Sequence, residues 1–283
     1  MNIQQALQQA TQDLSASSAT ASLDAQVMLS FILQCNSAHL AAWPEKNLDQ
    51  EQQTQYLNLI QQRTQGTPVA HLTGQREFWS LNFRVNESTL IPRPDTETLV
   101  EYILATFNDK PTLNLLDMGT GTGAIAISIA NEKPAWKITA CDLSNDALSL
   151  AKENSKTHQT NNITFIHSNW FTTIEQNDFD IIVSNPPYIA NDDPHLQQGD
   201  VRFEPDSALV SGKIGMDAIE HLCLHAKQHL APNGCLIVEH GYNQQQLVAE
   251  CFAKNDFSHI EQKPDLAGHI RMTAGTMNTL KNG

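Results

Sequence analysis

Residues 115–128, LLDMGTGTGAIAIS, decide the fold class because they join a buried strand to a helix through three closely spaced glycines. Gly119, Gly121 and Gly123 permit a tight turn and a close approach of the backbone to a ligand, while the following helix presents its N-terminus to that ligand. Asp142 ends the next apolar strand, where a carboxylate can accept hydrogen bonds from both hydroxyls of a ribose. The pattern predicts a doubly wound sheet that binds a nucleotide-like cofactor.

The glycine loop does not by itself identify the cofactor. Gly119, Gly121 and Ala124 also satisfy the G-x-G-x-x-G/A fingerprint of dinucleotide-binding proteins, so a nicotinamide-dependent dehydrogenase is an alternative at this step. A purely structural turn is the second alternative. The position of the loop between a strand and a helix favours binding over that alternative.

From about residue 112 onward, strands and helices alternate as they do in a doubly wound parallel sheet. The last two predicted strands are separated only by KPDLAGH, which is too short for a crossover helix, so we expect these strands to pair antiparallel. The predicted strands span residues 113–118, 137–142, 163–167, 179–184, 234–239, 259–263 and 269–273, and the predicted helices span 123–131, 144–155, 215–230 and 244–254.

The first 74 residues are predicted to form a small helical bundle. In residues 3–14, IQQALQQATQDL, the apolar side chains fall on one helical face and the glutamines on the other. Further helices are expected over residues 23–33 and 49–65. Residues 77–92 then show the two-residue alternation of a hairpin, with its turn expected at residues 86–88. The expected division is a helical substrate-recognition domain (1–74), a β-hairpin linker (75–94) and a catalytic domain (95–283).

Composition limits the classes of function. The 283 residues are about 40% hydrophobic, and the polar start MNIQQALQQATQD lacks the order of a signal peptide, so we expect a cytoplasmic protein without a membrane segment. The five cysteines form no C-x-x-C pair, which predicts neither a zinc site nor a disulfide framework. The formal net charge of −14 argues against a surface that binds duplex nucleic acid.

The strand FDIIVS is followed by an unusual turn, Asn185, Pro186, Pro187 and Tyr188. Open α/β sheets bind ligands at the carboxyl ends of their strands. The prolines fix their φ angles, so the turn is rigid and can offer carbonyl acceptors. Asn185 and such a carbonyl can accept both hydrogens of a planar NH2 group, while Tyr188 lays an aromatic face against it. The alternative is a strand-ending turn with a packing tyrosine.

The glycine loop, Asp142 and the NPPY turn together resemble the signature of S-adenosylmethionine-dependent methyltransferases that modify planar amino groups. That group includes DNA amino-methylases, ribosomal RNA guanine methylases and protein glutamine methyltransferases. Four further segments closely resemble the PrmC/HemK family, and the resemblance covers nearly the whole chain. They are HLTGQREFWSLNFRVNESTLIPRPDTETLVE (71–101), SNPPYI (184–189), FEPDSAL (203–209) and VEHGYNQ (238–244).

The resemblance implies a seven-stranded, Rossmann-like methyltransferase sheet with an antiparallel last strand, preceded by a helical bundle and a hairpin. It implies S-adenosyl-L-methionine as cofactor and S-adenosyl-L-homocysteine as product. The implied cofactor site comprises Gly119, Thr120, Gly121, Thr122, Gly123, Asp142, Asn185 and, on the adenine side, Trp170. The implied substrate site comprises Asn185, Pro186, Pro187 and Tyr188, of which Asn185, Pro186 and Tyr188 are implied to be catalytic.

The implied reaction is methylation of the side-chain N5 of the glutamine in the Gly-Gly-Gln motif of class 1 peptide-chain release factors, by a monomer. The alternative is methylation of a nucleic-acid amino group, adenine N6 or guanine N2, on a flipped base. Residues 1–75 hold only Lys46 and Arg63 against five carboxylates, so we expect no direct nucleic-acid contact. His221, His225 and His229 lack the further ligands of a metal site and predict a solvated helix face. Arg93 and Glu97 are expected either to border the active site or to serve a helix cap and an ion pair.

Overall fold

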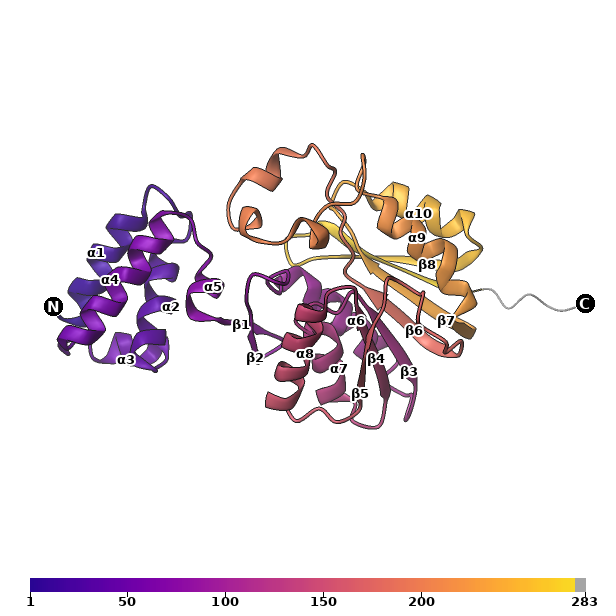
Figure 1. The fold of residues 1–283 in the computed structure, drawn as a ribbon, viewed down its shortest axis with the longest axis horizontal. Coiled ribbons are helices and arrows are strands. Elements are labelled where there is room, and N and C mark those ends of the chain that lie inside the picture. The colour runs from indigo at the N-terminus through magenta and orange to yellow at the C-terminus, as the bar shows by residue number, and fades with distance from the viewer. Residues whose placement is uncertain (278–283) are drawn as a thin grey trace, which may run out of the picture. The chain divides into compact units, whose positions relative to one another are not determined.

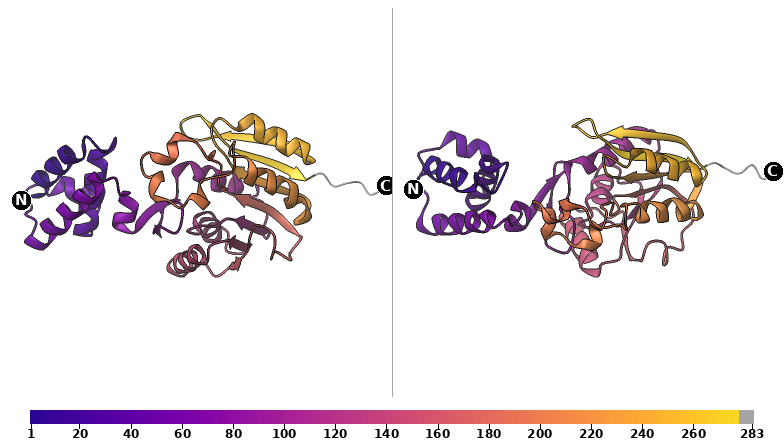
Figure 2. Two further views of the ribbon diagram at one scale, coloured as in Figure 1. Left: turned by 45° about the horizontal axis from the view of Figure 1, so that its top comes forward. Right: turned by 90° about the horizontal axis from the view of Figure 1, so that it is seen from above.

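The structure is a computed structural model that describes residues 1–277, and these residues form two compact units. The first unit contains Met1–Gln75 together with the short segment Gln197–Phe203. The second unit contains Arg76–Leu196 and residues 204–277. Figure 1 and Figure 2 show the first unit as a group of helices and the second as a sheet with helices on its faces.

The first unit packs five helices around one apolar core. Asn2 and Asp49 each begin a helix with a capping box, in which the side chain accepts a hydrogen bond from the third backbone amide of that helix. The three helices predicted from periodicity are present, and two short helices were missed. The bounds are α1 Ile3–Leu14, α2 Ala21–Leu33, α3 Ser37–Ala42, α4 Gln50–Thr64 and α5 Val69–Thr73.

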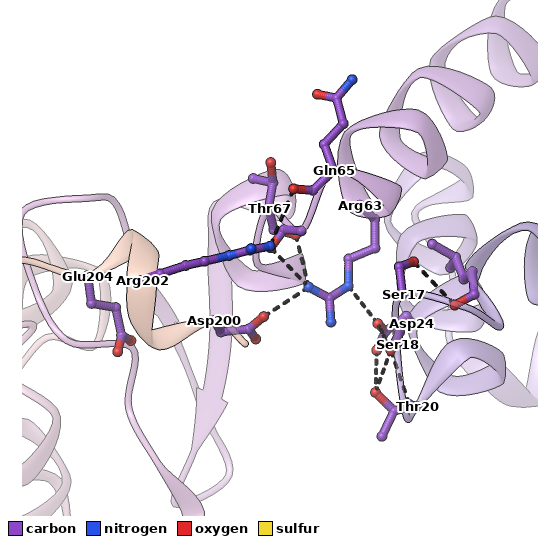
Figure 3. Close-up of polar contacts among 12 residues, drawn as sticks. Ser17, Ser18, Thr20, Asp24, Arg63, Gln65, Thr67, Asp200, Arg202 and Glu204 are labelled. Atoms are coloured by element: carbon purple, nitrogen blue, oxygen red, sulfur yellow. Dashed lines mark hydrogen bonds and ion pairs between the residues drawn. The ribbon is translucent and has the colours of Figure 1, made fainter. Parts of the chain in front are cut away.

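A buried ion pair ties this unit together (Figure 3). Arg63 on α4 donates from Nε to Asp24 Oδ2 at 2.7 Å and from Nη1 to Asp200 Oδ1 at 2.9 Å. The Asp24 carboxylate also accepts from the hydroxyls of Ser18 and Thr20, each at 2.8 Å. Arg63 therefore joins α2, α4 and the segment Gln197–Phe203 through one side chain.

The hairpin consists of β1 Gln75–Phe78 and β2 Leu81–Arg84, so its turn falls at Trp79 and Ser80 and the expected turn at residues 86–88 is wrong. Both turn residues have positive φ, +50° and +58°, as a two-residue turn that follows the twist of the strands requires. Such turns favour Asn-Gly, and Trp-Ser gives no such signal. Glu97 Oε1 accepts a hydrogen bond from the Trp79 amide at 2.8 Å and holds this turn.

The second unit is built on a seven-stranded sheet in the order β5-β4-β3-β6-β7-β9-β8. The first five strands of this order are parallel, and β9 pairs antiparallel with both β7 and β8, which confirms the predicted fold class. The bounds are β3 Asn114–Met118, β4 Lys137–Asp142, β5 Ile163–His167, β6 Phe179–Ser184, β7 Leu230–Glu239, β8 Phe257–Pro264 and β9 Ile270–Met277.

Helices cover both faces of the sheet (Figure 1). The helices α6 and α7 contribute to one apolar cluster and α9 and α10 to the other, while α8 packs beside β4 and β5. Within residues 1–277, no helix has the length and apolarity needed to cross a membrane. The bounds are α6 Glu97–Thr106, preceded by a 3-10 turn Pro94–Thr96, then α7 Ala124–Glu132, α8 Asn145–Thr157, α9 Asp217–His225 and α10 Gln245–Lys254.

One boundary differs clearly from the prediction. The helix expected to reach residue 230 ends at His225 and is followed by a 3-10 turn, while β7 begins at Leu230 instead of residue 234. The extension begins with a pairing to β6, because Phe179 is in register with Leu230 and its amide donates to the His229 carbonyl at 3.0 Å. A register shift between Phe179 and Ile181 accommodates the Pro-Asn-Gly sequence at residues 232–234.

Candidate active site

The carboxyl ends of β3, β4 and β6 open into a cavity of about 710 Å³ in the second unit. This volume lies within the usual range of small-molecule sites, roughly 300–1,000 Å³. Nine of the residues predicted for the cofactor and substrate sites line it, namely Gly119, Thr120, Gly121, Thr122, Asp142, Trp170, Asn185, Pro186 and Pro187. Two predicted residues, Gly123 and Tyr188, lie outside the lining.

The glycine loop is fixed to the end of β4. The amides of Gly119 and Thr120 both donate to the Cys141 carbonyl at 2.9 Å. Gly121 has a φ of +55°, the left-handed region that glycine adopts without strain. Gly123 serves packing, since a Cβ there would lie 2.7 Å from the Ile127 Cδ1 atom. Backbone hydrogen bonds and packing therefore hold the loop at the end of β4.

Asp142 is held from two directions. Its Oδ2 accepts from the Gly121 amide and its Oδ1 accepts from the Ser144 amide, both at 2.9 Å. Each carboxylate oxygen can accept more than one hydrogen bond, so Asp142 can still receive ribose hydroxyls. Beyond the ribose role predicted from the sequence, Asp142 braces the glycine loop.

Asp117, at the end of β3, is a buried carboxyl group that sequence analysis did not single out. Its Oδ2 accepts from the Thr120 hydroxyl at 2.6 Å and from the Ala126 amide at 3.2 Å. Burial raises the pKa of Asp117 to about 7, and these two hydrogen bonds oppose the rise. Within residues 1–277 its Oδ1 is buried without a hydrogen-bond partner. Asp117 does not line the cavity, so its carboxyl group braces the glycine loop through Thr120 and the start of α7 through Ala126. The signal in the sequence is a carboxylate immediately before the loop.

The NPPY turn follows β6 and is anchored on both sides. Ser184 Oγ donates to the Met118 carbonyl at 2.7 Å, and Asn185 Nδ2 donates to Thr96 Oγ1 at 3.0 Å. The Tyr188 hydroxyl donates to Glu239 Oε1 at 3.1 Å. The predicted role of the Tyr188 ring as a wall for the substrate amide remains a prediction. Neither Thr96 nor Glu239 was singled out in the sequence.

Arg93 and Glu97 have separate environments. Arg93 lines the cavity, and its Nη2 pairs with Glu204 Oε2 at 2.5 Å. The other oxygen of Glu204 accepts from the Ile91 amide at 2.9 Å, and this carboxylate is fully buried. Glu97 lies outside the lining and holds the hairpin turn. Arg93 therefore borders the site, while Glu97 is structural.

Trp170 follows β5, has a φ of +52° and lines the cavity, and its place on the adenine side stays a prediction. The His221 ring lies 5.3 Å from it, centroid to centroid, and also lines the cavity. His225 and His229 continue the row, with His229 stacked on Phe171 at 4.8 Å. The three histidines thus form a half-buried aromatic cluster, unlike the predicted solvated face. No group of three metal-ligating side chains occurs among the described residues.

Comparison with known proteins identifies the family. Residues 5–74 match the PrmC N-terminal domain, and residues 95–200 match the methyltransferase small domain. The release factor glutamine methyltransferase of Shewanella oneidensis is 45% identical over 273 residues, which cover 96% of this chain and 95% of that protein. The chain belongs to the release factor glutamine methyltransferase family. The family member from Escherichia coli is 42% identical over 275 residues, covering 97% and 99% of the two chains. The family predicted from the sequence motifs is thus confirmed.

A solved structure supports the fold. The methyltransferase from Pyrococcus furiosus superposes with a TM-score of 0.54 at 18% identity, covering 82% of this chain and 100% of that one. At this identity the likeness shows the fold alone. The cofactor of this family is S-adenosyl-L-methionine. The residues present fit it, because Asp142 lines the cavity with carboxylate oxygens that can accept ribose hydroxyls, beside the glycine loop.

Proposed function

We propose that this chain transfers a methyl group from S-adenosyl-L-methionine to the side-chain nitrogen, N5, of the glutamine in the Gly-Gly-Gln motif of class 1 release factors. The observation that carries the proposal is the placement of Asn185 and Pro186 on the cavity that the glycine loop and Asp142 also line. The near-full-length relatives support the substrate class. Because release factors act at ribosomes, the proposal places the reaction in the cytoplasm.

An amide nitrogen is a poor nucleophile because its lone pair is delocalised into the carbonyl. The cofactor supplies an electrophilic methyl group on a sulfonium. Asn185 Oδ1 and the Pro186 carbonyl accept the two N–H groups, which orients the nitrogen and favours the positive charge that develops on it. Alignment of this kind can contribute several kcal/mol, on the order of 7 or more in well-oriented systems. The methylated nitrogen then loses its proton to water.

The test is transfer of a labelled methyl group. Purified protein is incubated with methyl-labelled S-adenosyl-L-methionine and, separately, with a release factor, duplex DNA or ribosomal RNA. We expect label in the release factor, and its loss when the glutamine of Gly-Gly-Gln is replaced. Label in either nucleic acid and none in the release factor would overturn the proposal in favour of a nucleic-acid methyltransferase.

The helical unit is proposed to recognise the release factor. Leu23, Val27 and Phe31 lie four residues apart on α2, and they are 57%, 41% and 40% exposed. They form an apolar stripe along one helix, and such exposed patches mark protein-interaction sites. With two basic residues against five carboxylates, residues 1–75 are poorly suited to nucleic acid and better suited to a protein.

The stripe is tested with Val27→Asp. We expect the KM for the release factor to rise about tenfold, since a central interface side chain contributes more than about 1 kcal/mol. The kcat and the affinity for S-adenosyl-L-homocysteine should stay unchanged. The matched control is Leu57→Asp, which adds the same charge at a 48% exposed leucine on α4. Equal KM values for the two variants would contradict the docking role.

A further inference from the structure

The side chain of Asn185 is hydrogen-bonded to a buried residue, Thr96, that has no part in the mechanism proposed above. Its Nδ2 donates to Thr96 Oγ1 at 3.0 Å, and Thr96 is buried in the 3-10 turn before α6. An asparagine amide has two ends of nearly equal size, one an acceptor and one a donor. The hydrogen bond to Thr96 therefore determines which end faces the cavity.

Thr96 in turn lies against the buried carboxyl group of Glu239, at the end of β7. Glu239 Oε1 accepts from the Tyr188 hydroxyl at 3.1 Å, and the Thr96 hydroxyl interacts with the same carboxyl group. Glu239 Oε2 is buried without a hydrogen-bond partner in the described part of the chain. The register of the sheet explains this placement: Ser184 pairs with Val238, so Asn185 and Glu239 follow at the same level of adjacent strands.

The direction of these hydrogen bonds follows from the chemistry of the groups. An ionised carboxylate can only accept, so the hydroxyls of Thr96 and Tyr188 must donate to Glu239. The Thr96 oxygen then has only lone pairs left for Asn185. The amide must present Nδ2 to Thr96 and Oδ1 to the cavity. The reversed amide would place an NH2 group against the substrate NH2 group, a donor facing a donor.

We propose that Thr96 and Glu239 are positioning residues that fix the direction of the Asn185 amide, so that Oδ1 faces the substrate nitrogen. This inference rests on the proposed function. Thr96 acts through Asn185, and Glu239 acts through Thr96. Tyr188 donates to the Glu239 carboxylate and so helps to hold Glu239 in place. This contact is separate from the substrate role predicted for the Tyr188 ring.

The orientation of the Asn185 amide should depend on pH, because Glu239 can gain or lose a proton. Burial raises the pKa of Glu239 to about 7, and the negative charge of Asp95 adds to this rise. Hydrogen bonds from Thr96 and Tyr188 and the positive charge of Arg271 oppose it. Arg271 Nη2 also lies 3.7 Å from Asp95 Oδ2. Burial and Glu239 raise the pKa of the Tyr188 hydroxyl, and the charges of Arg271 and Arg93 oppose that rise. Below this pH a protonated Glu239 can donate to Thr96, which can then donate to Asn185 Oδ1 and reverse the amide. We therefore expect kcat to rise with pH through about 7.

The experiment compares Thr96→Val, Thr96→Ser and the control Thr106→Val, which makes the same substitution at an exposed site on α6. We expect Thr96→Val to lower kcat about 10- to 100-fold, the scale of a small misalignment. Calorimetry with S-adenosyl-L-homocysteine should show unchanged affinity. Thr96→Ser should restore most of kcat. Glu239→Gln should give a low kcat without the rise near pH 7, because an amide can also donate.

A second measurement tests the orientation without catalysis. In ¹⁵N-labelled free protein, the side-chain NH2 signals of Asn185, assigned by their loss in Asn185→Ala, should shift with pH near 7, and Thr96→Val should abolish that shift. Wild-type kcat and an unchanged pH profile in Thr96→Val would overturn the inference. Absence of transfer by the wild type would refute the proposed function instead, and the NMR titration would still decide the inference.

Discussion

Replacement of Asp142 by alanine is the sharpest test of the cofactor site. The Asp142 carboxylate accepts hydrogen bonds from the Gly121 amide of the glycine loop and from the amide of Ser144, the N-cap residue of α8. In the proposed complex it also accepts two ribose hydroxyls. Asp142→Ala removes all four hydrogen bonds, and only the two to the ribose are made when the cofactor binds. The loss of affinity should therefore reflect mainly those two.

The magnitude follows from the strength of hydrogen bonds to a charged acceptor. Each contributes about 1.5–3 kcal/mol, so two contribute about 3–6 kcal/mol. Asp142 is partly exposed, which favours the lower end of that range. At about 1.4 kcal/mol per factor of ten, a loss of about 3 kcal/mol weakens binding roughly 100-fold. Asp142→Asn keeps one of its two oxygen acceptors and should weaken binding about tenfold.

The assay is isothermal calorimetry with S-adenosyl-L-homocysteine on the full chain. Asp146→Ala is the matched control, because it removes an exposed carboxylate from the first turn of α8 close to the same site. We expect the control to bind like the wild type. An affinity of Asp142→Ala within threefold of the wild type would refute the ribose role. A large fall in kcat at saturating cofactor, with affinity intact, would assign Asp142 to the reaction itself.

Three further variants separate chemistry from stability. Asn185→Ala should lower methyl transfer at least about 100-fold, as loss of a preorganised hydrogen-bonding group does, with calorimetric affinity for S-adenosyl-L-homocysteine within a few-fold; a near wild-type rate would refute its role. Arg63→Met leaves Asp24 buried without its cation and should destabilise the first unit by about 3–5 kcal/mol, measured by hydrogen exchange of α2 and α4 amides. Asp200→Asn removes a partner that is 37% exposed and should cost less than about 1 kcal/mol. Equal losses in these two variants would contradict the central role of the Asp24 pair.

The sheet was predictable because its strands are short apolar runs with polar or glycine-containing connections. Three predicted strands, Lys137–Asp142, Ile163–His167 and Phe179–Ser184, have the predicted bounds. The short helices α3 and α5 were missed because six or five residues are too few to show a helical period. The hairpin turn was misplaced because its residues carry no turn signal, and tertiary packing imposes their positive φ angles.

The motif residues of the candidate site were predictable because they are consecutive in the chain. The residues that support them were not, because they come from distant segments. Thr96 is 89 residues from Asn185, and Glu239 is 51 residues from Tyr188. Periodicity and local propensity contain no information about such pairs.

One rule would have found Glu239 before the structure was known. Once NPPY is placed at the carboxyl end of β6, its neighbours are whatever residues end the adjacent parallel strands, β3 and β7. β7 ends its apolar run CLIV with a single carboxylate, Glu239, and β3 ends LLDM with another, Asp117. Burial of a charged group at the end of a strand costs desolvation free energy, and apolar packing does not offset that cost. Two such carboxylates therefore point to the same edge of the sheet, where one braces the cofactor loop and the other supports the amide of Asn185.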